Sequence, residues 1–141
     1  MIQRIQTVYL FLGALALAAL GSFDVPWNST AAATHAWFVP TLVALTVLTV
    51  GLALWAIFLY SRRETQRTVV VGTQVATVLL AGALYGGLYL TSELTFTEAQ
   101  GIDWGRAFVL LLPLLAYVFF YLARRGIAHD IELVQSMDRL R

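Results

Sequence analysis

Four long apolar stretches run through the chain, and the middle of each is free of Asp, Glu, Arg, Lys and His. Crossing a bilayer as a helix takes roughly 20 mostly apolar residues, because every backbone polar group must be satisfied within the segment. We predict spans over residues 5–23, 36–60, 68–91 and 106–123. The pattern indicates an all-α membrane protein, a four-transmembrane-helix bundle that forms a single domain.

The composition agrees with this class. Of the 141 residues, 60% are hydrophobic and 12% are charged, whereas about 25% of a soluble domain is charged. The net charge of +1 gives no basic surface for a nucleic-acid partner, so membrane lipids are the expected partners. Uncharged spans disfavour proton or ion pumping, which usually needs an ionisable group at depth. Cysteine is absent, which excludes disulfides and thiolate sites, and we expect neither a cofactor nor a metal.

The charges sort by sign between the spans. Eight of the nine basic residues fall in alternate segments, namely Arg4, Arg62, Arg63, Arg67, Arg124, Arg125, Arg139 and Arg141. The other segments hold Asp24, Glu93, Glu98 and Asp103, with Arg106 as the exception. Because short cytoplasmic segments retain positive charge, we predict that both termini are cytoplasmic.

The first apolar stretch also fits a signal peptide with a small-residue cleavage site after Gly21. Only Arg4 precedes it, however, and the apolar run is long for the core of such a signal. We therefore expect a retained helix.

Small residues recur at a spacing that lets helices approach closely. Four residues apart puts two side chains on one helix face, and the residues concerned are Gly82 with Gly86, Ala83 with Gly87, and Ala14 with Ala18. The spacing predicts helix packing. The partner helix can belong to the same bundle, to a second copy, or to a larger complex.

A few uncharged polar residues lie within the third span. Gln74, Thr77 and Tyr85 define a candidate polar cavity for a neutral solute. The alternative is purely structural, because a threonine can bond its own helix's preceding carbonyl and a glutamine can bond across to another helix.

The segment 124–141 is predicted to be a cytoplasmic helical tail. Leu133, Met137 and Leu140 share one helix face there, so the tail can pack under the bundle, lie at the interface, or bind a partner. The arginines at the span ends are predicted to contact anionic lipid headgroups; these are Arg62, Arg63, Arg124 and Arg125.

The outer segments carry the remaining candidates for chemistry. Asn28 or Ser29 can cap a short helix. His35 could form a divalent-metal or catalytic site with Glu98 and Asp103 if the loops converge, although solvated loop charge is the simpler interpretation. No phosphate loop, serine–histidine–acid set or HExxH motif is present.

The opening MIQRIQTVYL, the four spans and the closing IAHDIELVQSMDRLR together resemble a family of small uncharacterised membrane proteins of Bacteroidota and related bacteria, a domain of unknown function. The likeness covers essentially the whole chain. Its most distinctive parts are residues 1–7 and the terminal Ser136, Asp138, Arg139 and Arg141. The resemblance implies a four-helix inner-membrane protein and brings no established activity.

Taken with the uncharged spans, this favours an accessory or scaffold subunit of a bacterial inner-membrane assembly. The alternative is a small transporter, or a lipid- or quinone-binding protein, for a neutral ligand. An enzyme with its chemistry in the outer loops is the third hypothesis.

Overall fold

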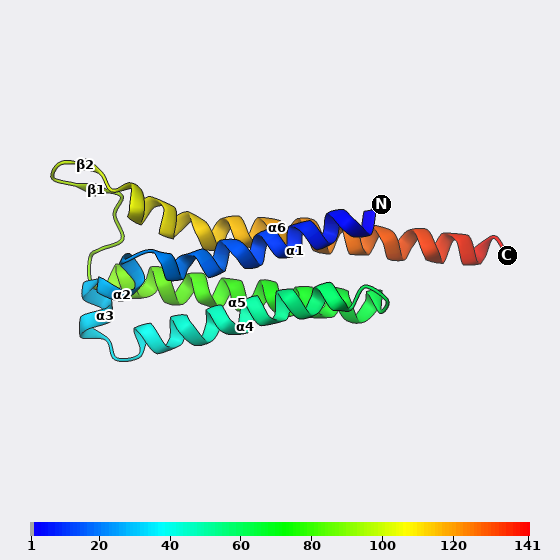
Figure 1. The fold of residues 1–141 in the computed structure, drawn as a ribbon, viewed down its shortest axis with the longest axis horizontal. Coiled ribbons are helices and arrows are strands. Elements are labelled where there is room, and N and C mark those ends of the chain that lie inside the picture. The colour runs from blue at the N-terminus through cyan, green and yellow to red at the C-terminus, as the bar shows by residue number, and fades with distance from the viewer. Residues whose placement is uncertain (1) are drawn as a thin grey trace.

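The computed structural model describes residues 2–141, with side chains from residue 5 onward. Most of the chain lies in four long helices: α1 (Ile2–Ala18), α4 (Phe38–Phe58), α5 (Arg63–Leu90) and α6 (Trp104–Arg139) (Figure 1). A 3-10 helix, η1 (Ala19–Ser22), extends the first of them. Within residues 2–141, four helices are suited by length and composition to cross a membrane. The prediction of an all-α fold with four such helices is confirmed.

The four helices form an up-down-up-down bundle. Helix α1 packs against α4 and α6, and helix α5 also packs against α4 and α6. The ring order is therefore α1–α4–α5–α6, with each helix antiparallel to both of its neighbours (Figure 1). The short connection between α4 (ending at Phe58) and α5 (starting at Arg63) favours this arrangement, because a short loop returns the chain beside the helix it has just left.

Helix α6 joins the predicted fourth span and the predicted tail in one unbroken helix. Its last turns project beyond α1 and beyond the turn between α4 and α5 (Figure 1). Gly126 lies inside this helix rather than at its end. A Cβ atom there would lie 2.9 Å from Cγ of Gln6, so the missing side chain lets α1 approach α6 closely.

The opposite end of the bundle carries the short elements. Helices α2 (Val25–Asn28) and α3 (Thr30–Thr34) follow α1, and a small antiparallel hairpin of β1 (Thr97–Glu98) and β2 (Gly101–Ile102) precedes α6. The hydroxyl of Ser29 accepts a hydrogen bond from the backbone N–H of Ala32 at 3.2 Å. Of the two capping candidates, Ser29 therefore caps α3.

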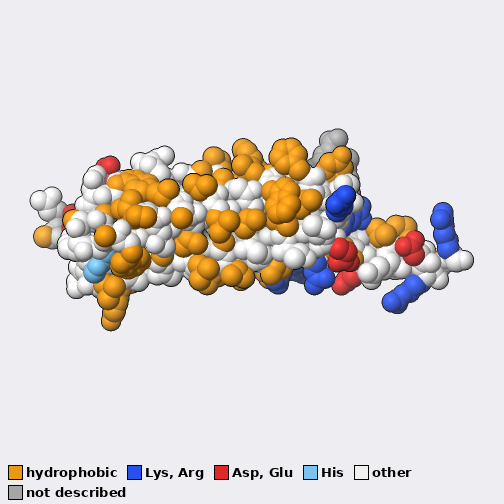
Figure 2. Space-filling view, turned by 90° about the horizontal axis from the view of Figure 1, so that it is seen from below, with side chains coloured by type: hydrophobic (Ala, Val, Ile, Leu, Met, Phe, Trp, Pro, Cys, Tyr) orange, Lys and Arg blue, Asp and Glu red, His pale blue; other side chains and the backbone are white. Residues whose placement is uncertain are grey.

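The bundle has an apolar interior and an apolar flank. Phe38 and Phe120 are the largest fully buried side chains, surrounded by buried leucine, valine and alanine. Large apolar side chains such as Val47, Phe58 and Leu79 are exposed on the outside. Figure 2 shows hydrophobic side chains spread along the flank of the bundle. This surface is compatible with a multi-pass membrane protein.

The basic side chains gather at the end of the bundle from which α6 projects (Figure 2). We call this the arginine-rich end; its residues are Arg62, Arg63, Arg67, Arg124 and Arg125.

Candidate functional site

The glycines of the predicted GxxxG pair lie away from the other helices. Gly82 is exposed and Gly86 is half-buried, and a Cβ atom added at either would meet no described atom within 4 Å. Gly87, by contrast, is buried, and a Cβ atom there would overlap the ring of Phe38 on α4. The close approach between α4 and α5 is therefore made at Gly87.

The other small residues are likewise partly buried against neighbouring helices and partly exposed. Ala14 is buried in the core, Ala83 packs against it, and Ala18 is exposed. Helix α1 approaches α6 closely at Gly13, where a Cβ atom would overlap the ring of Phe120. Spacing alone misses Gly13, because it has no small residue four positions away in the pattern; its partner is an aromatic ring on another helix.

The three residues of the predicted polar cavity all lie on α5, but the structure does not bring them to one cavity. Gln74 and Thr77 are buried inside the bundle, and the Thr77 hydroxyl donates to the carbonyl one turn back at 2.8 Å. Tyr85 lies eleven residues after Gln74, about 16 Å along the helix axis. Its hydroxyl donates to the carbonyl of Leu110 on α6, and its ring lines a separate apolar pocket between α5 and α6.

Two of the buried glutamines are hydrogen-bonded across helices. Gln66 Nε2 on α5 donates to the carbonyl of Ala56 on α4 at 3.0 Å. Gln6 Nε2 on α1 donates to Asp130 Oδ2 on α6 at 2.8 Å. Each bond joins an antiparallel helix pair near the arginine-rich end. No local sequence pattern predicts either hydrogen bond.

Gln74 is the exception among these amides. It is only 4% exposed, yet neither its Nε2 nor its Oε1 has a hydrogen-bond partner among the described residues. A buried amide without partners costs free energy. The neighbouring threonines do not relieve it, since Thr73 and Thr77 donate to carbonyls of their own helix.

An apolar crevice of about 190 Å³ opens between α1, α2 and α4. Val43 and Val47 of α4 form part of its wall, and the buried Leu84 of α5 lies on its inner side. The indole N–H of Trp27 donates to the carbonyl of Gly21 at 3.3 Å, which ties this ring to η1 at the crevice. None of its described lining residues is charged. Apolar cavities of about 150 Å³ bind benzene, so a segment of hydrocarbon chain fits.

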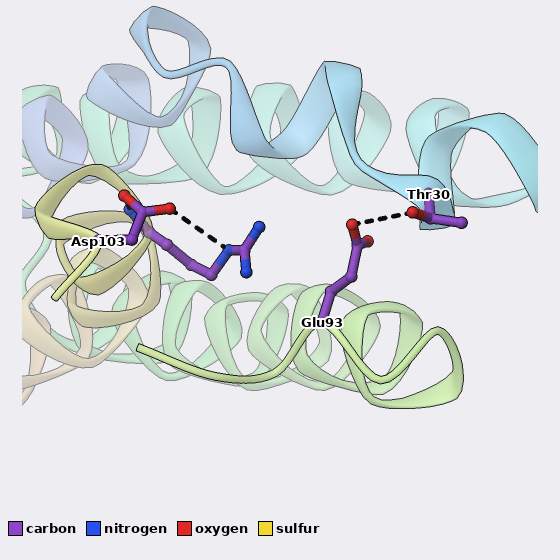
Figure 3. Close-up of polar contacts among 4 residues, drawn as sticks. Thr30, Glu93 and Asp103 are labelled. Carbon is purple, nitrogen blue, oxygen red and sulfur yellow. Dashed lines mark hydrogen bonds and ion pairs between the residues drawn. The ribbon is translucent and has the colours of Figure 1, made fainter. Parts of the chain in front are cut away.

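A polar cluster ties the outer segments together. Glu93, after α5, accepts a hydrogen bond from the hydroxyl of Thr30 at 2.9 Å (Figure 3). It also accepts one from the hydroxyl of Thr91 at 3.1 Å. It also faces the backbone N–H of Ala31, at 3.4 Å. Burial acts to raise the pKa of Glu93, but these hydrogen bonds outweigh it and hold the pKa below the usual glutamate value. The ionised carboxylate thus fastens α3 to the end of α5.

Asp103 also makes structural contacts, at the start of α6. Its Oδ1 accepts from the backbone N–H of Arg106 at 3.1 Å, which caps the helix. Its Oδ2 lies 3.7 Å from Nε of Arg106, forming the ion pair drawn in Figure 3. Both carboxylates in the cluster are therefore committed to structural contacts.

The structure does not bring His35 into a metal-binding group among the described residues. Among the residues that the structure describes, no three His, Asp or Glu side chains converge in a geometry suited to a metal ion. His35 lies beside Trp37, with 5.9 Å between ring centroids. Glu98 lies in the small hairpin, and Asp103 caps α6.

The four arginines predicted to contact lipid headgroups lie at the arginine-rich end. Arg62 and Arg125 are exposed, whereas Arg63 and Arg124 are half-buried. The guanidinium of Arg124 lies 5.7 Å from the centroid of the Tyr121 ring. Arg63 also lines a groove between the α4–α5 turn and the projecting part of α6.

The fold and its surface define a small helical-bundle protein with four candidate membrane spans. Residues 2–140 match the family described as domain of unknown function (DUF4293), and the chain belongs to this family. No curated protein and no solved structure matches the chain.

Proposed function

We propose that the chain is an accessory or scaffold subunit of an assembly in the bacterial inner membrane. The observation that carries this proposal is the projecting part of α6. Leu133, Met137 and Leu140 lie on one face of that helix and are exposed outside the bundle. Apolar side chains arranged in this way are typical of helices that bind a partner.

We place the arginine-rich end and both termini in the cytoplasm. The support is the positive-inside bias of short membrane loops, because only Arg106 among the basic residues lies at the end that carries Glu93 and Asp103. In this orientation Arg62 and Arg125, both exposed, contact anionic headgroups, with Arg63 and Arg124 beside them.

Native mass spectrometry after purification in mild detergent tests the subunit proposal. We expect the chain, of 15.6 kDa, to be recovered from its native membranes within a larger complex of defined mass. A strictly solitary monomer at every detergent concentration contradicts the proposal.

Labelling of single cysteines tests the orientation, since the natural chain has none. Ser136→Cys on α6 and Ala99→Cys in the hairpin turn are both exposed. An impermeant thiol reagent added outside spheroplasts should label Ala99→Cys alone. The reverse pattern contradicts the cytoplasmic placement.

A second candidate function is binding of a neutral lipid or quinone. The observation that favours it is the apolar crevice beside Trp27, which opens on the flank of the bundle. Ala18→Phe fills this crevice. Gly51→Phe instead adds a ring on α4 where a Cβ atom meets no described atom within 4 Å. We expect only Ala18→Phe to reduce the lipid or quinone that co-purifies. Equal amounts in both variants contradict this role.

A further inference from the structure

The groove between the α4–α5 turn and the projecting part of α6 has a volume of about 610 Å³. Most of its lining residues carry a hydrogen-bonding group, unlike those of the apolar crevice beside Trp27. The polar lining residues are Tyr60, Ser61, Arg63 and Glu64 on one side and Gln135 of α6 on the other. Ile131 of α6 adds an aliphatic part to the wall.

The polar side chains of this groove are uncommitted. No described residue forms a hydrogen bond or an ion pair with any of the five. Arg63 is half-buried, so its guanidinium loses part of its hydration without gaining a carboxylate partner. Glu64 is the next residue and lines the same groove, yet the two opposite charges do not pair with each other. The groove therefore offers one positive group, one negative group and several neutral ones to a ligand.

The groove lies at the level of the lipid headgroups if the four helices cross a bilayer. Arg67 is the charged residue of α5 nearest to its uncharged span. Arg63 lies four residues before it, about 6 Å further along the helix axis. The polar layer on each side of a bilayer is about 5–8 Å thick. Arg63 and Glu64 therefore lie among headgroups rather than among acyl chains.

We propose that this groove binds the headgroup of one phospholipid that carries both a phosphate and a primary ammonium group, as phosphatidylethanolamine does. Charge complementarity determines the choice of ligand. The Arg63 guanidinium donates to the phosphate oxygens, and the Glu64 carboxylate accepts from the ammonium group. The inference deepens the headgroup contact proposed for the arginines and rests on the membrane placement. It depends neither on the subunit role nor on which end is cytoplasmic.

Other lipid groups fit the groove less well. An anionic headgroup without an ammonium group brings a like charge to Glu64. A trimethylammonium headgroup has the same net charge as the ethanolamine one but no N–H to donate to the carboxylate. An acyl chain would desolvate the polar groups of the groove without bonding to any of them.

The first experiment compares an ethanolamine and a choline phospholipid with identical acyl chains, each titrated into the full-length chain in mild detergent and counted by native mass spectrometry. Both carry the phosphate, so contacts made by arginines alone affect them equally. We expect the ethanolamine lipid to bind about fivefold more tightly. Equal binding overturns the proposal. A glycerol-headgroup anionic lipid, titrated separately, reports the arginine contacts, so failure of that contact is distinguishable from failure of the groove.

The second experiment places the preference in the groove. Glu64→Gln should bind the two lipids equally, and Arg63→Gln should weaken both alike. The matched controls are Glu132→Gln and Arg62→Gln, which change exposed charges outside the groove lining and should keep the preference. All four variants should unfold at the temperature of the natural chain, because none of these side chains contacts a described partner. A preference that survives Glu64→Gln, or that is lost in Glu132→Gln, overturns the site.

The third experiment separates a lipid from a soluble compound with the same chemistry. O-Phosphoethanolamine carries the same phosphate and ammonium groups without acyl chains. We expect it to displace the ethanolamine lipid only at a large excess, because the lipid is held at the bilayer or micelle surface beside the groove. Displacement at equal concentration shows a site for a soluble ligand and overturns the lipid assignment.

Discussion

Gln6 donates a hydrogen bond from Nε2 to Oδ2 of Asp130 at 2.8 Å, across 124 positions of the chain. Both side chains are buried, and Gly126 gives Gln6 the room to reach α6. A buried carboxylate is costly without a donor. The pair therefore fixes the register of α1 on α6 at the point where α6 leaves the bundle.

Gln6→Leu should destabilise the bundle by about 1–3 kcal/mol, because it leaves the Asp130 carboxylate buried without this donor. Thermal and denaturant unfolding in detergent would measure the loss. The double variant Gln6→Leu with Asp130→Leu should recover part of it, since the stranded carboxylate is then gone. Additive losses in the double variant contradict a coupled pair.

Gly13→Ala and Gly87→Ala should each cost about 1–3 kcal/mol of unfolding free energy, because the added methyl group overlaps the buried rings of Phe120 and Phe38. The matched controls are Gly82→Ala and Gly86→Ala, where a Cβ atom meets no described atom within 4 Å. Alanine also favours a helix interior by about 1 kcal/mol over glycine, so the controls should be neutral or stabilising. Equal losses at all four positions contradict the packing described above.

These glycines show how far the sequence could predict the structure. The four spans were predictable because a long uncharged apolar run has one stable solution in a bilayer. The GxxxG spacing puts Gly82 and Gly86 on one face of α5, but no described atom lies within 4 Å of a Cβ atom added at either. Which neighbour, if any, lies against that face depends on how α5 is rotated within the bundle, and spacing carries no information about that rotation.

The polar contacts could not be predicted from the sequence, for a related reason. Gln74 and Tyr85 lie on one helix, yet the rise of 1.5 Å per residue separates them by about 16 Å. The Gln6–Asp130 bond joins two ends of the chain, and neither residue is part of a local motif. Ser29, by contrast, was predictable as a candidate cap because capping acts within three residues.

Ser92→Gly should stabilise the protein by about 0.5–1 kcal/mol. Ser92 follows α5 with φ of 59°, a left-handed conformation that glycine adopts without a steric penalty. The backbone N–H of Glu93 bonds to the carbonyl of Leu88 at 2.8 Å, which completes a helix-ending motif that favours glycine at this position. The control is Ser92→Ala, which keeps the penalty and should give no gain in thermal unfolding. A gain in both variants contradicts the conformational explanation.

The contact between Glu93 and Thr30 should make stability depend on pH. The hydrogen bonds from Thr30, Thr91 and Ala31 lower the pKa of Glu93 in the folded protein despite its partial burial. A lowered folded pKa contributes stability above the unfolded value of about 4.3, and this contribution is lost as pH falls through the folded pKa. The stability difference between the natural chain and Glu93→Gln should therefore be largest near neutral pH and shrink below about pH 4. A difference that stays constant from pH 7 to pH 3 contradicts this role.

Gln66 and Gln74, two turns apart on α5, should respond in opposite ways to the same substitution. Gln66→Leu removes the bond to the Ala56 carbonyl, and should cost about 1–3 kcal/mol in unfolding free energy. Gln74→Leu removes a buried amide whose two polar atoms have no partner among the described residues. It should therefore stabilise the bundle by about 1 kcal/mol or more, since leucine fills a similar volume without the desolvation cost.

Comparing the Gln66→Leu and Gln74→Leu variants also tests whether Gln74 has a function inside the membrane. If Gln74 holds a solute or an ordered water there, Gln74→Leu strands that group and destabilises the protein as Gln66→Leu does. Unfolding of both variants in detergent and again in lipid nanodiscs separates the two cases. A stabilising Gln74→Leu in both media leaves Gln74 as an unpaired core amide and removes the main support for a solute path along α5.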